Sequence, residues 1–251
     1  METSVTEKLL SLNRQFYQTF ALQFSATRQR LQPGVKRLMA GFPTDAYILD
    51  LGCGNGELAL SLEKSRFQGQ YIGCDASPDL LILAKSRLFQ VSKASPEQYQ
   101  FVLLDLSSPK WENSVPQLSY NLVLSFAVLH HLPGRILRRQ CLSALHNLLN
   151  NQTSAHPFFA LSVWQFLNNP RLRSRIQPWN SIGLCDADVE TGDYLLDWRH
   201  GGYGLRYVHH FNEDELKALA EETGFSVRQT FYADGEGGNL GLYQVWELMR
   251  V

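Results

Sequence analysis

The sequence predicts an α/β fold in which a seven-stranded, mainly parallel β-sheet carries helices on both faces. Two observations lead to the layered architecture: short apolar segments typical of buried strands alternate with segments of helical periodicity, and a glycine-rich turn joins the first strand to a helix. A third observation concerns the end of the chain, where residues 234–238 form a glycine-rich connection between the last two predicted strands. This connection predicts an antiparallel hairpin, so the last strand should run against the others.

Composition narrows the class of protein. The 251 residues fit one sizeable domain with insertions, and 44% apolar with 19% charged residues is a globular mixture. The 23 basic and 24 acidic side chains leave a net charge of −1, which removes the simplest argument for a nucleic-acid partner. The first ten residues lack an apolar signal core, no segment resembles a membrane span, and the four cysteines lack zinc spacing. We therefore expect a cytoplasmic protein with free thiols and no metal site.

The first part of the chain predicts a helical cap and then regular alternation. Helical patterns over 4–31 and 34–41 form an N-terminal cap, residues 1–43. Five strands are expected over 46–51, 70–75, 99–104, 120–126 and 158–164. The helices between them are expected over 58–65, 78–89 and 135–149, and Ser77 and Pro78 are suited to the start of the second. These elements define a core over residues 44–164.

The second part interrupts this alternation. Residues 165–207 are rich in Asn, Pro, Arg and Gly and predict an insertion or lid on the substrate side. Residues 208–251 are expected to complete the core sheet: a helix begins after Asn212 and ends at Gly224, and strands follow over 225–232 and 241–248.

The strongest local motif is the segment Asp50-Leu51-Gly52-Cys53-Gly54-Asn55-Gly56, between a strand and a helix. Glycines at such a turn let the backbone approach a ligand without a Cβ clash. The third glycine comes one position earlier than in the G-x-G-x-x-G dinucleotide fingerprint, which argues against a nicotinamide-dependent dehydrogenase. The acidic residue that opens the segment suits a ligand carrying an amine.

This motif resembles the first motif of class I S-adenosylmethionine-dependent methyltransferases, a Rossmann-like family. The resemblance continues in family order with acidic residues at the ends of the next two strands, Asp75 and Asp105, and with the segment 127–132 after the fourth strand. It implies that Asp50 orients the methionine end of the cofactor, Asp75 binds the ribose hydroxyls and Asp105 meets the adenine. The full set of cofactor-binding residues that we expect is Tyr17, Asp50, Gly52, Cys53, Gly54, Asn55, Gly56, Asp75, Ala76, Asp105, Leu106, Ser125 and Phe126.

Two further segments resemble the tRNA methyltransferases that esterify a carboxymethyl group on the wobble uridine. Residues 24–28 match the F-S-x-T-R pattern of that family, and residues 206–211 are similar to R-Y-Y-H-x-F/Y. The sequence departs from the family at Asp197, where proline is usual, and at Val208, which replaces the second tyrosine. The resemblance implies a tRNA substrate, and eukaryotic members of the family use a small activating partner protein.

A carboxylate acceptor has a pKa of about 4 and needs no general base, but it needs a cationic clamp. Arg28 and Arg206 are the candidates, because a guanidinium group binds a carboxylate in a bidentate manner. The alternative acceptor is a small-molecule acid, phenol or amine, and for a phenol or amine His130 would become a useful base. A cofactor-binding module without catalysis is the third possibility.

Charge is unevenly distributed along the chain. Residues 135–175 contain six arginines and no acidic residue, whereas residues 186–197 contain five acidic residues. An arginine-rich stretch with aromatic side chains nearby could contact phosphates and bases. It could also pair with the acidic stretch, and the sequence leaves both interpretations open.

Overall fold

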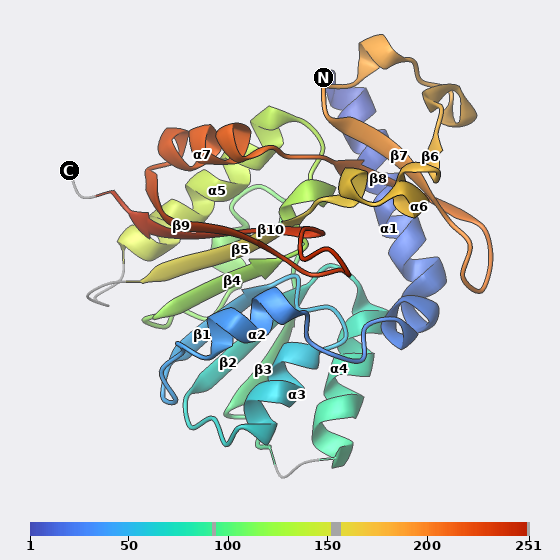
Figure 1. Ribbon diagram of the computed structural model, residues 1–251. Coiled ribbons are helices and arrows are strands. Elements are labelled where there is room, and N and C mark those ends of the chain that lie inside the picture. The colour runs from blue at the N-terminus through green and yellow to red at the C-terminus, as the bar shows by residue number, and fades with distance from the viewer. Residues whose placement is uncertain (92–93, 152–156, 250–251) are drawn as a thin grey trace.

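The computed structural model describes residues 1–91, 94–151 and 157–249 (Figure 1). Its main sheet has the strand order β3-β2-β1-β4-β5-β10-β9. The strands are β1 (Tyr47–Leu51), β2 (Gln70–Asp75), β3 (Tyr99–Leu103), β4 (Leu122–Phe126), β5 (Phe158–Trp164), β9 (Phe225–Ala233) and β10 (Gly241–Leu248). The pairs from β3 to β5 are parallel, and β10 is antiparallel to both β5 and β9. The predicted seven-stranded sheet with an antiparallel last strand is confirmed.

Helices cover both faces of this sheet. One face carries α2 (Pro33–Met39), α3 (Glu57–Lys64) and α4 (Pro78–Val91), and the other carries α5 (Arg135–Asn150) and α7 (Glu213–Glu222). Alternation along β1 explains the two cores, because successive side chains of a strand point to opposite faces. Ile48 packs in the core with Leu62 of α3, whereas Leu49 packs in the core with Leu145 of α5.

The first helix, α1 (Thr3–Ala26), is shorter than the sequence predicts, and it kinks at Phe20. The predicted continuation to residue 31 is wrong. The Asn55 side-chain amide donates to the backbone carbonyls of Ser25, at 3.3 Å, and of Arg28, at 2.9 Å, which stabilises a turn in place of another helical turn. Residues 27–32 therefore form a loop that runs beside the glycine segment.

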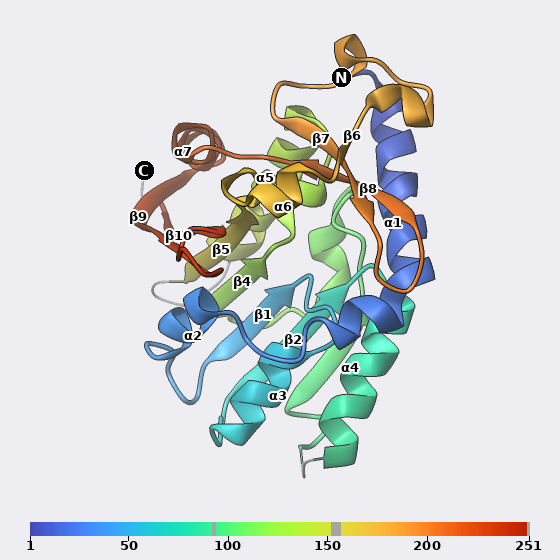
Figure 2. The same cartoon turned by 45° about the vertical axis from the view of Figure 1, so that its right-hand side comes forward.

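The sequence missed a second sheet. Strands β6 (Ile176–Gln177), β7 (Asp193–Trp198) and β8 (Gly204–His209) form an antiparallel sheet, preceded by the short helix α6 (Pro170–Arg173). Asn13 of α1 holds this sheet through two bonds to the backbone of Tyr207, one accepted from its N–H at 2.8 Å and one donated to its carbonyl at 3.2 Å. Leu9 and Leu195 pack beside this contact. As a result, α1 and the small sheet lie together at one end of the main sheet (Figures 1 and 2).

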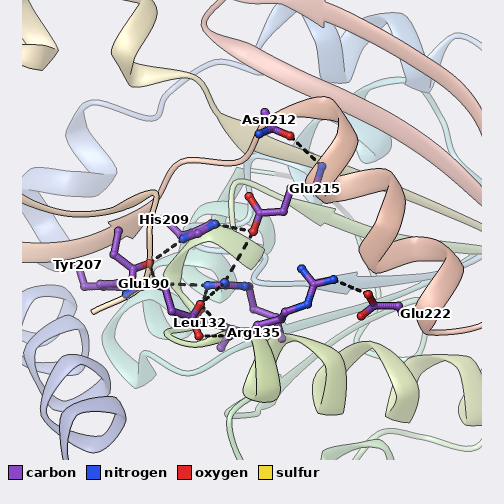
Figure 3. Close-up of polar contacts among 10 residues, drawn as sticks. Leu132, Arg135, Glu190, Tyr207, His209, Asn212, Glu215 and Glu222 are labelled. Atoms are coloured by element: carbon purple, nitrogen blue, oxygen red, sulfur yellow. Dashed lines mark hydrogen bonds and ion pairs between the residues drawn. The ribbon is translucent and has the colours of Figure 1, made fainter. Parts of the chain in front are cut away.

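A buried polar network also ties the small sheet to α5 and α7 (Figure 3). Arg138 is 1% exposed and donates to Glu190 at 2.8 Å. His209 lies between Asp193 and Glu215, with nitrogen–oxygen distances of 2.6 and 2.9 Å. Burial lowers the pKa of His209, but the hydrogen bonds to these two carboxylates outweigh burial and raise it overall. The small sheet is therefore anchored by charged contacts as well as by apolar packing.

Candidate active site

A cavity of about 840 Å³ opens at the carboxyl ends of β1, β2, β3 and β4. Its lining includes the glycine segment and the acidic residues at these strand ends on one side, and residues of α1, α6, β7 and β8 on the other. Ligands of parallel α/β sheets bind at this edge, where the strand order reverses. The cavity lies in the upper part of the roughly 300–1,000 Å³ range that is typical of ligand pockets.

The glycines of the segment have different physical roles. Gly52, Gly54 and Gly56 all have positive φ angles, of 81°, 55° and 73°. A Cβ atom on Gly52 would lie 2.2 Å from a methyl group of Val128, and one on Gly56 would lie 2.8 Å from Cβ of Ala84. A Cβ on Gly54 would have no atom within 4 Å. Gly52 and Gly56 therefore allow close packing, whereas Gly54 borders open space that a ligand can fill.

Two carboxyl groups flank this open space. Asp75 accepts hydrogen bonds from the backbone N–H of Gly54, at 2.8 Å, and of Ser77, at 2.9 Å. Asp50 is buried and accepts a hydrogen bond of 2.5 Å from the Tyr71 hydroxyl. Burial raises the pKa of both carboxyl groups, that of Asp50 to about 7. A ligand that supplies a cation or hydroxyl donors would favour their ionised forms.

Asp105 and Asn55 are already engaged in contacts within the protein. Asp105 accepts bonds from the backbone N–H and hydroxyl of Ser107, at 2.8 and 2.6 Å, and forms an exposed ion pair with Arg14 at 3.4 Å. The Asn55 side-chain amide donates to the Ser25 hydroxyl and to the Arg28 carbonyl at the end of α1. Its side chain therefore joins the cap to the glycine segment.

Most of the residues expected at the site do meet there. The cavity is lined by Tyr17, Arg28, Asp50, Gly52, Cys53, Gly54, Asn55, Asp75, Ala76, Asp105, Leu106, Phe126, His130 and Arg206. Gly56 and Ser125 do not line it: Gly56 precedes α3, and Ser125 is buried within β4. His131, part of the segment expected beside the cofactor, lines the cavity together with His130, and so do Arg171 and Arg175, which the sequence did not assign to the site. The arginine-rich stretch was the only signal that pointed toward two of them.

The two adjacent histidines use their acceptor nitrogens within the protein. His130 is 2% exposed, and its Nδ1 accepts a bond from the backbone N–H of Trp164 at 3.2 Å. His131 donates from Nδ1 to the Tyr207 carbonyl at 3.2 Å, so its Nε2 accepts from the Tyr17 hydroxyl at 2.9 Å. Burial lowers the pKa of both, that of His131 to about 3. Both imidazoles are therefore neutral at pH 7, and each acceptor nitrogen already has a donor.

Arg206 has an unusual environment for a buried cation. It is 6% exposed, and its guanidinium carbon lies 4.8 Å from the ring centre of Trp164, 5.3 Å from Phe16 and 5.7 Å from Trp198. Within the described residues, no carboxylate forms an ion pair with it, and its Nε has no hydrogen-bond partner. Glu215, nine positions further along the chain, instead binds His209 and lies 3.9 Å from Arg138. Burial lowers the pKa of Arg206.

Arg28 is the second cation on this side of the cavity. It lies over the ring of Phe24, with 5.0 Å from its guanidinium carbon to the ring centre, and bonds the hydroxyl of Thr27 at 3.3 Å. Arg28 and Arg206 come from opposite ends of the sequence but lie near each other in the fold. Burial is the largest cause of the lowered pKa of Arg206, and the charge of Arg28 lowers it further. The cavity therefore brings carboxyl groups at the ends of β1 and β2 together with cationic side chains from the loop after α1 and from β8.

These features define a class I methyltransferase. A family model described as a methyltransferase domain matches residues 24–230, and the chain belongs to this family. The tRNA (carboxymethyluridine(34)-5-O)-methyltransferase of Schizosaccharomyces pombe is 26% identical over 87% of this chain and 90% of its own length. The mouse enzyme of that name, ALKBH8, is 30% identical over 54% of this chain, which corresponds to 18% of the mouse protein. A SAM-dependent methyltransferase from Methanosarcina mazei has the same fold, with a TM-score of 0.63, 21% identity, and coverage of 88% of this chain and 100% of that one.

The cofactor of the family is S-adenosylmethionine, which supplies its methyl group as an electrophile bound to a sulfonium. The cavity suits it, because Gly54 borders open space and two carboxyl groups flank that space. Asp50 is the residue that would hold the ammonium group of the methionine end, and Asp75 would accept hydrogen bonds from the ribose.

Among the helices that the structure describes, none combines the length and apolar character that a membrane span requires.

We expect the affinity for S-adenosylhomocysteine to increase as the pH rises through about 7, the value to which burial raises the pKa of Asp50. Below this pKa the carboxyl group is neutral and cannot pair with the ligand's ammonium group, whereas above it the group is anionic. Calorimetric titrations at a series of pH values should show this increase, and Asp50→Asn should flatten it. Tyr71→Phe should move the midpoint to higher pH, because it removes the donor that stabilises the anion. A flat wild-type profile would contradict this role of Asp50.

Proposed function

We propose that the protein transfers a methyl group to the carboxylate of the carboxymethyl group on a tRNA wobble uridine, and so forms a methyl ester. One observation carries the proposal: Arg206 is a buried guanidinium that faces the cavity and has no carboxylate partner within the described residues. A buried cation is costly unless an anion accompanies it. A carboxylate acceptor bound in the cavity beside Arg206 would supply that anion.

The state of the histidines supports an acceptor that is already ionised. A phenol, hydroxyl or protonated amine must lose a proton to a base, but His130 and His131 have no free acceptor nitrogen. A carboxylate needs no base, because its pKa is about 4. The protein's task is then to hold one carboxylate oxygen in line with the carbon–sulfur bond that breaks. In the reaction an oxygen–carbon bond forms, the carbon–sulfur bond breaks, and its electron pair remains on sulfur.

Arg206 and Arg28 would share the binding of the acceptor. Three aromatic rings restrict the orientation of the Arg206 guanidinium, and the Tyr17 hydroxyl lies beside it. Because Tyr17 donates its proton to His131, its oxygen presents lone pairs to the cation. This arrangement leaves the donors of Arg206 in place before the acceptor arrives, which reduces the entropic cost of binding. The names of the relatives from S. pombe and mouse support the carboxymethyluridine of tRNA as that acceptor.

The labelled-methyl assay separates the proposed substrate from its alternative. Protein and radiolabelled cofactor are incubated with bulk tRNA or with a small-molecule extract, and we expect label in the tRNA. Mild alkali should release that label as methanol, because it hydrolyses a methyl ester but not a methylated base or ribose. Label that stays on the RNA would contradict ester formation, and label only in the extract would favour a small-molecule acid.

A further inference from the structure

The structure divides the six arginines of residues 135–175 into two groups. The first group, Arg135, Arg138 and Arg139, lies on α5 and is neutralised by acidic residues. Arg135 pairs with Glu222, and Arg139 lies 3.6 Å from the same carboxylate. Arg138 is enclosed in the buried network with Glu190. Arg135 links α5 to α7, Arg138 links α5 to the segment before β7, Arg139 is exposed, and none of the three lines the cavity.

The second group comes from α6 and the turn into β6. Arg171 and Arg175 line the cavity beside Arg206, and neither forms an ion pair with any described residue. Arg173 lies between them in the sequence but does not line the cavity. Asn169 caps α6 by accepting a bond from the Leu172 N–H at 3.2 Å. The carbonyl of Arg175 accepts from the N–H of Asp197 in β7 at 3.0 Å, so both arginines are carried on anchored backbone.

The cavity thus holds more positive charge than one carboxylate acceptor neutralises. Arg28, Arg171, Arg175 and Arg206 all line it, and Arg30 lines it as well. Asp197, whose backbone bonds Arg175, also lines the cavity, and its Oδ2 accepts bonds from Arg199 at 2.6 Å and from Gln177 at 3.1 Å. A substrate with several negative charges spaced along a chain would match this set, whereas a small monocarboxylic acid would leave most of it unpaired.

We infer that Arg171 and Arg175 bind the phosphodiester groups next to the acceptor nucleotide, so that α6 and the small sheet form the docking face for RNA. This inference rests on the proposed function, since it assumes that the acceptor is part of an RNA. Guanidinium groups bind phosphate oxygens in a bidentate manner, and contacts of this kind position an RNA without reading its sequence. Trp164, which lines the cavity beside Arg206, offers a ring on which the acceptor base can stack.

The test compares two double variants in RNA binding. Arg171→Ala with Arg175→Ala removes the inferred phosphate contacts. Arg139→Ala with Arg228→Ala removes the same charge from exposed positions that lie outside the cavity lining. Fluorescence anisotropy with a labelled anticodon stem–loop RNA gives Kd over a series of salt concentrations. For the first variant we expect roughly 10- to 30-fold weaker binding near 0.1 M salt and a slope of log K against log salt that is shallower by about 1.4.

The control should change the slope by much less, and both variants should bind S-adenosylhomocysteine as the wild type does. The double variant Arg171→Lys with Arg175→Lys keeps both charges, so its salt slope should be close to that of the wild type. This result would show that the alanine variant loses affinity through the lost charge and not through poor folding. If the wild type methylates RNA and the two alanine variants lose affinity equally, the inference is overturned and the proposed function stands. If the wild type neither binds nor methylates RNA, the proposed substrate itself fails.

Discussion

Replacing Arg206 with methionine is expected to lower kcat/KM for methyl transfer by roughly 10²- to 10³-fold, because a buried charge that pairs with the acceptor is lost. The affinity for S-adenosylhomocysteine should change little, since Asp50 and Asp75 take their hydrogen bonds from Tyr71 and from the backbone of Gly54 and Ser77, not from Arg206. Steady-state kinetics with tRNA as acceptor and calorimetry with S-adenosylhomocysteine measure the two quantities separately.

The stability of this variant distinguishes a functional from a structural role. A guanidinium buried among Phe16, Trp164 and Trp198 without a carboxylate partner is costly to fold. Methionine fills a similar space without that cost, so the free energy of unfolding should stay the same or increase. Arg37→Met is the matched control, because Arg37 also lies over an aromatic ring, at 4.2 Å from that of Phe231, but outside the cavity lining. Retained turnover in Arg206→Met would exclude the clamp.

The second large effect is expected at the cofactor end. Asp75→Ala should weaken the binding of S-adenosylhomocysteine by roughly 100-fold, or about 3 kcal/mol. The variant loses the acceptor for the ribose hydroxyls and also leaves the N–H groups of Gly54 and Ser77 without their partner. Calorimetry measures the affinity, and thermal unfolding shows whether the glycine segment remains ordered.

Asp79→Ala is the control for this change, because Asp79 is an exposed acid four positions further along the chain and does not line the cavity. Asp75→Asn should give an intermediate affinity, since the amide keeps one acceptor oxygen at the same place. Unchanged binding in Asp75→Ala would refute the ribose-binding role, and equal losses in Asp75→Ala and Asp79→Ala would point to a general effect of charge.

Local sequence signals were sufficient for the main sheet. Buried parallel strands appear as short apolar runs, and helix starts such as Asn212 carry their own side-chain caps. The boundary of α1 was missed, because the turn that ends it depends on a bond from Asn55. The small sheet was missed because β6 has only two residues and its partner β7 lies about 20 residues further along the chain. Neither feature has a local signature.

The residues of the candidate site likewise fall into those with a local sequence signal and those without one. The glycine segment, Asp50 and Asp75 could be recognised because they follow one another on a regular strand–turn–helix pattern, and the chain order of a parallel sheet brings such strand ends to one edge. The sequence by itself therefore determined the fold class, the family and which strand ends meet at this edge of the sheet. The acceptor end depends on contacts between α1, β5 and the small sheet, which are far apart in the chain.

Only the tertiary structure decided which arginines are free. In the sequence, Arg138 and Arg175 belong to the same basic stretch, and no local feature distinguishes them. In the fold, Glu190 neutralises Arg138, whereas Arg175 joins Arg206 in the cavity lining without an acidic partner among the described residues. The physical reason is that an ion pair depends on distance in space, which long-range packing sets and sequence spacing does not.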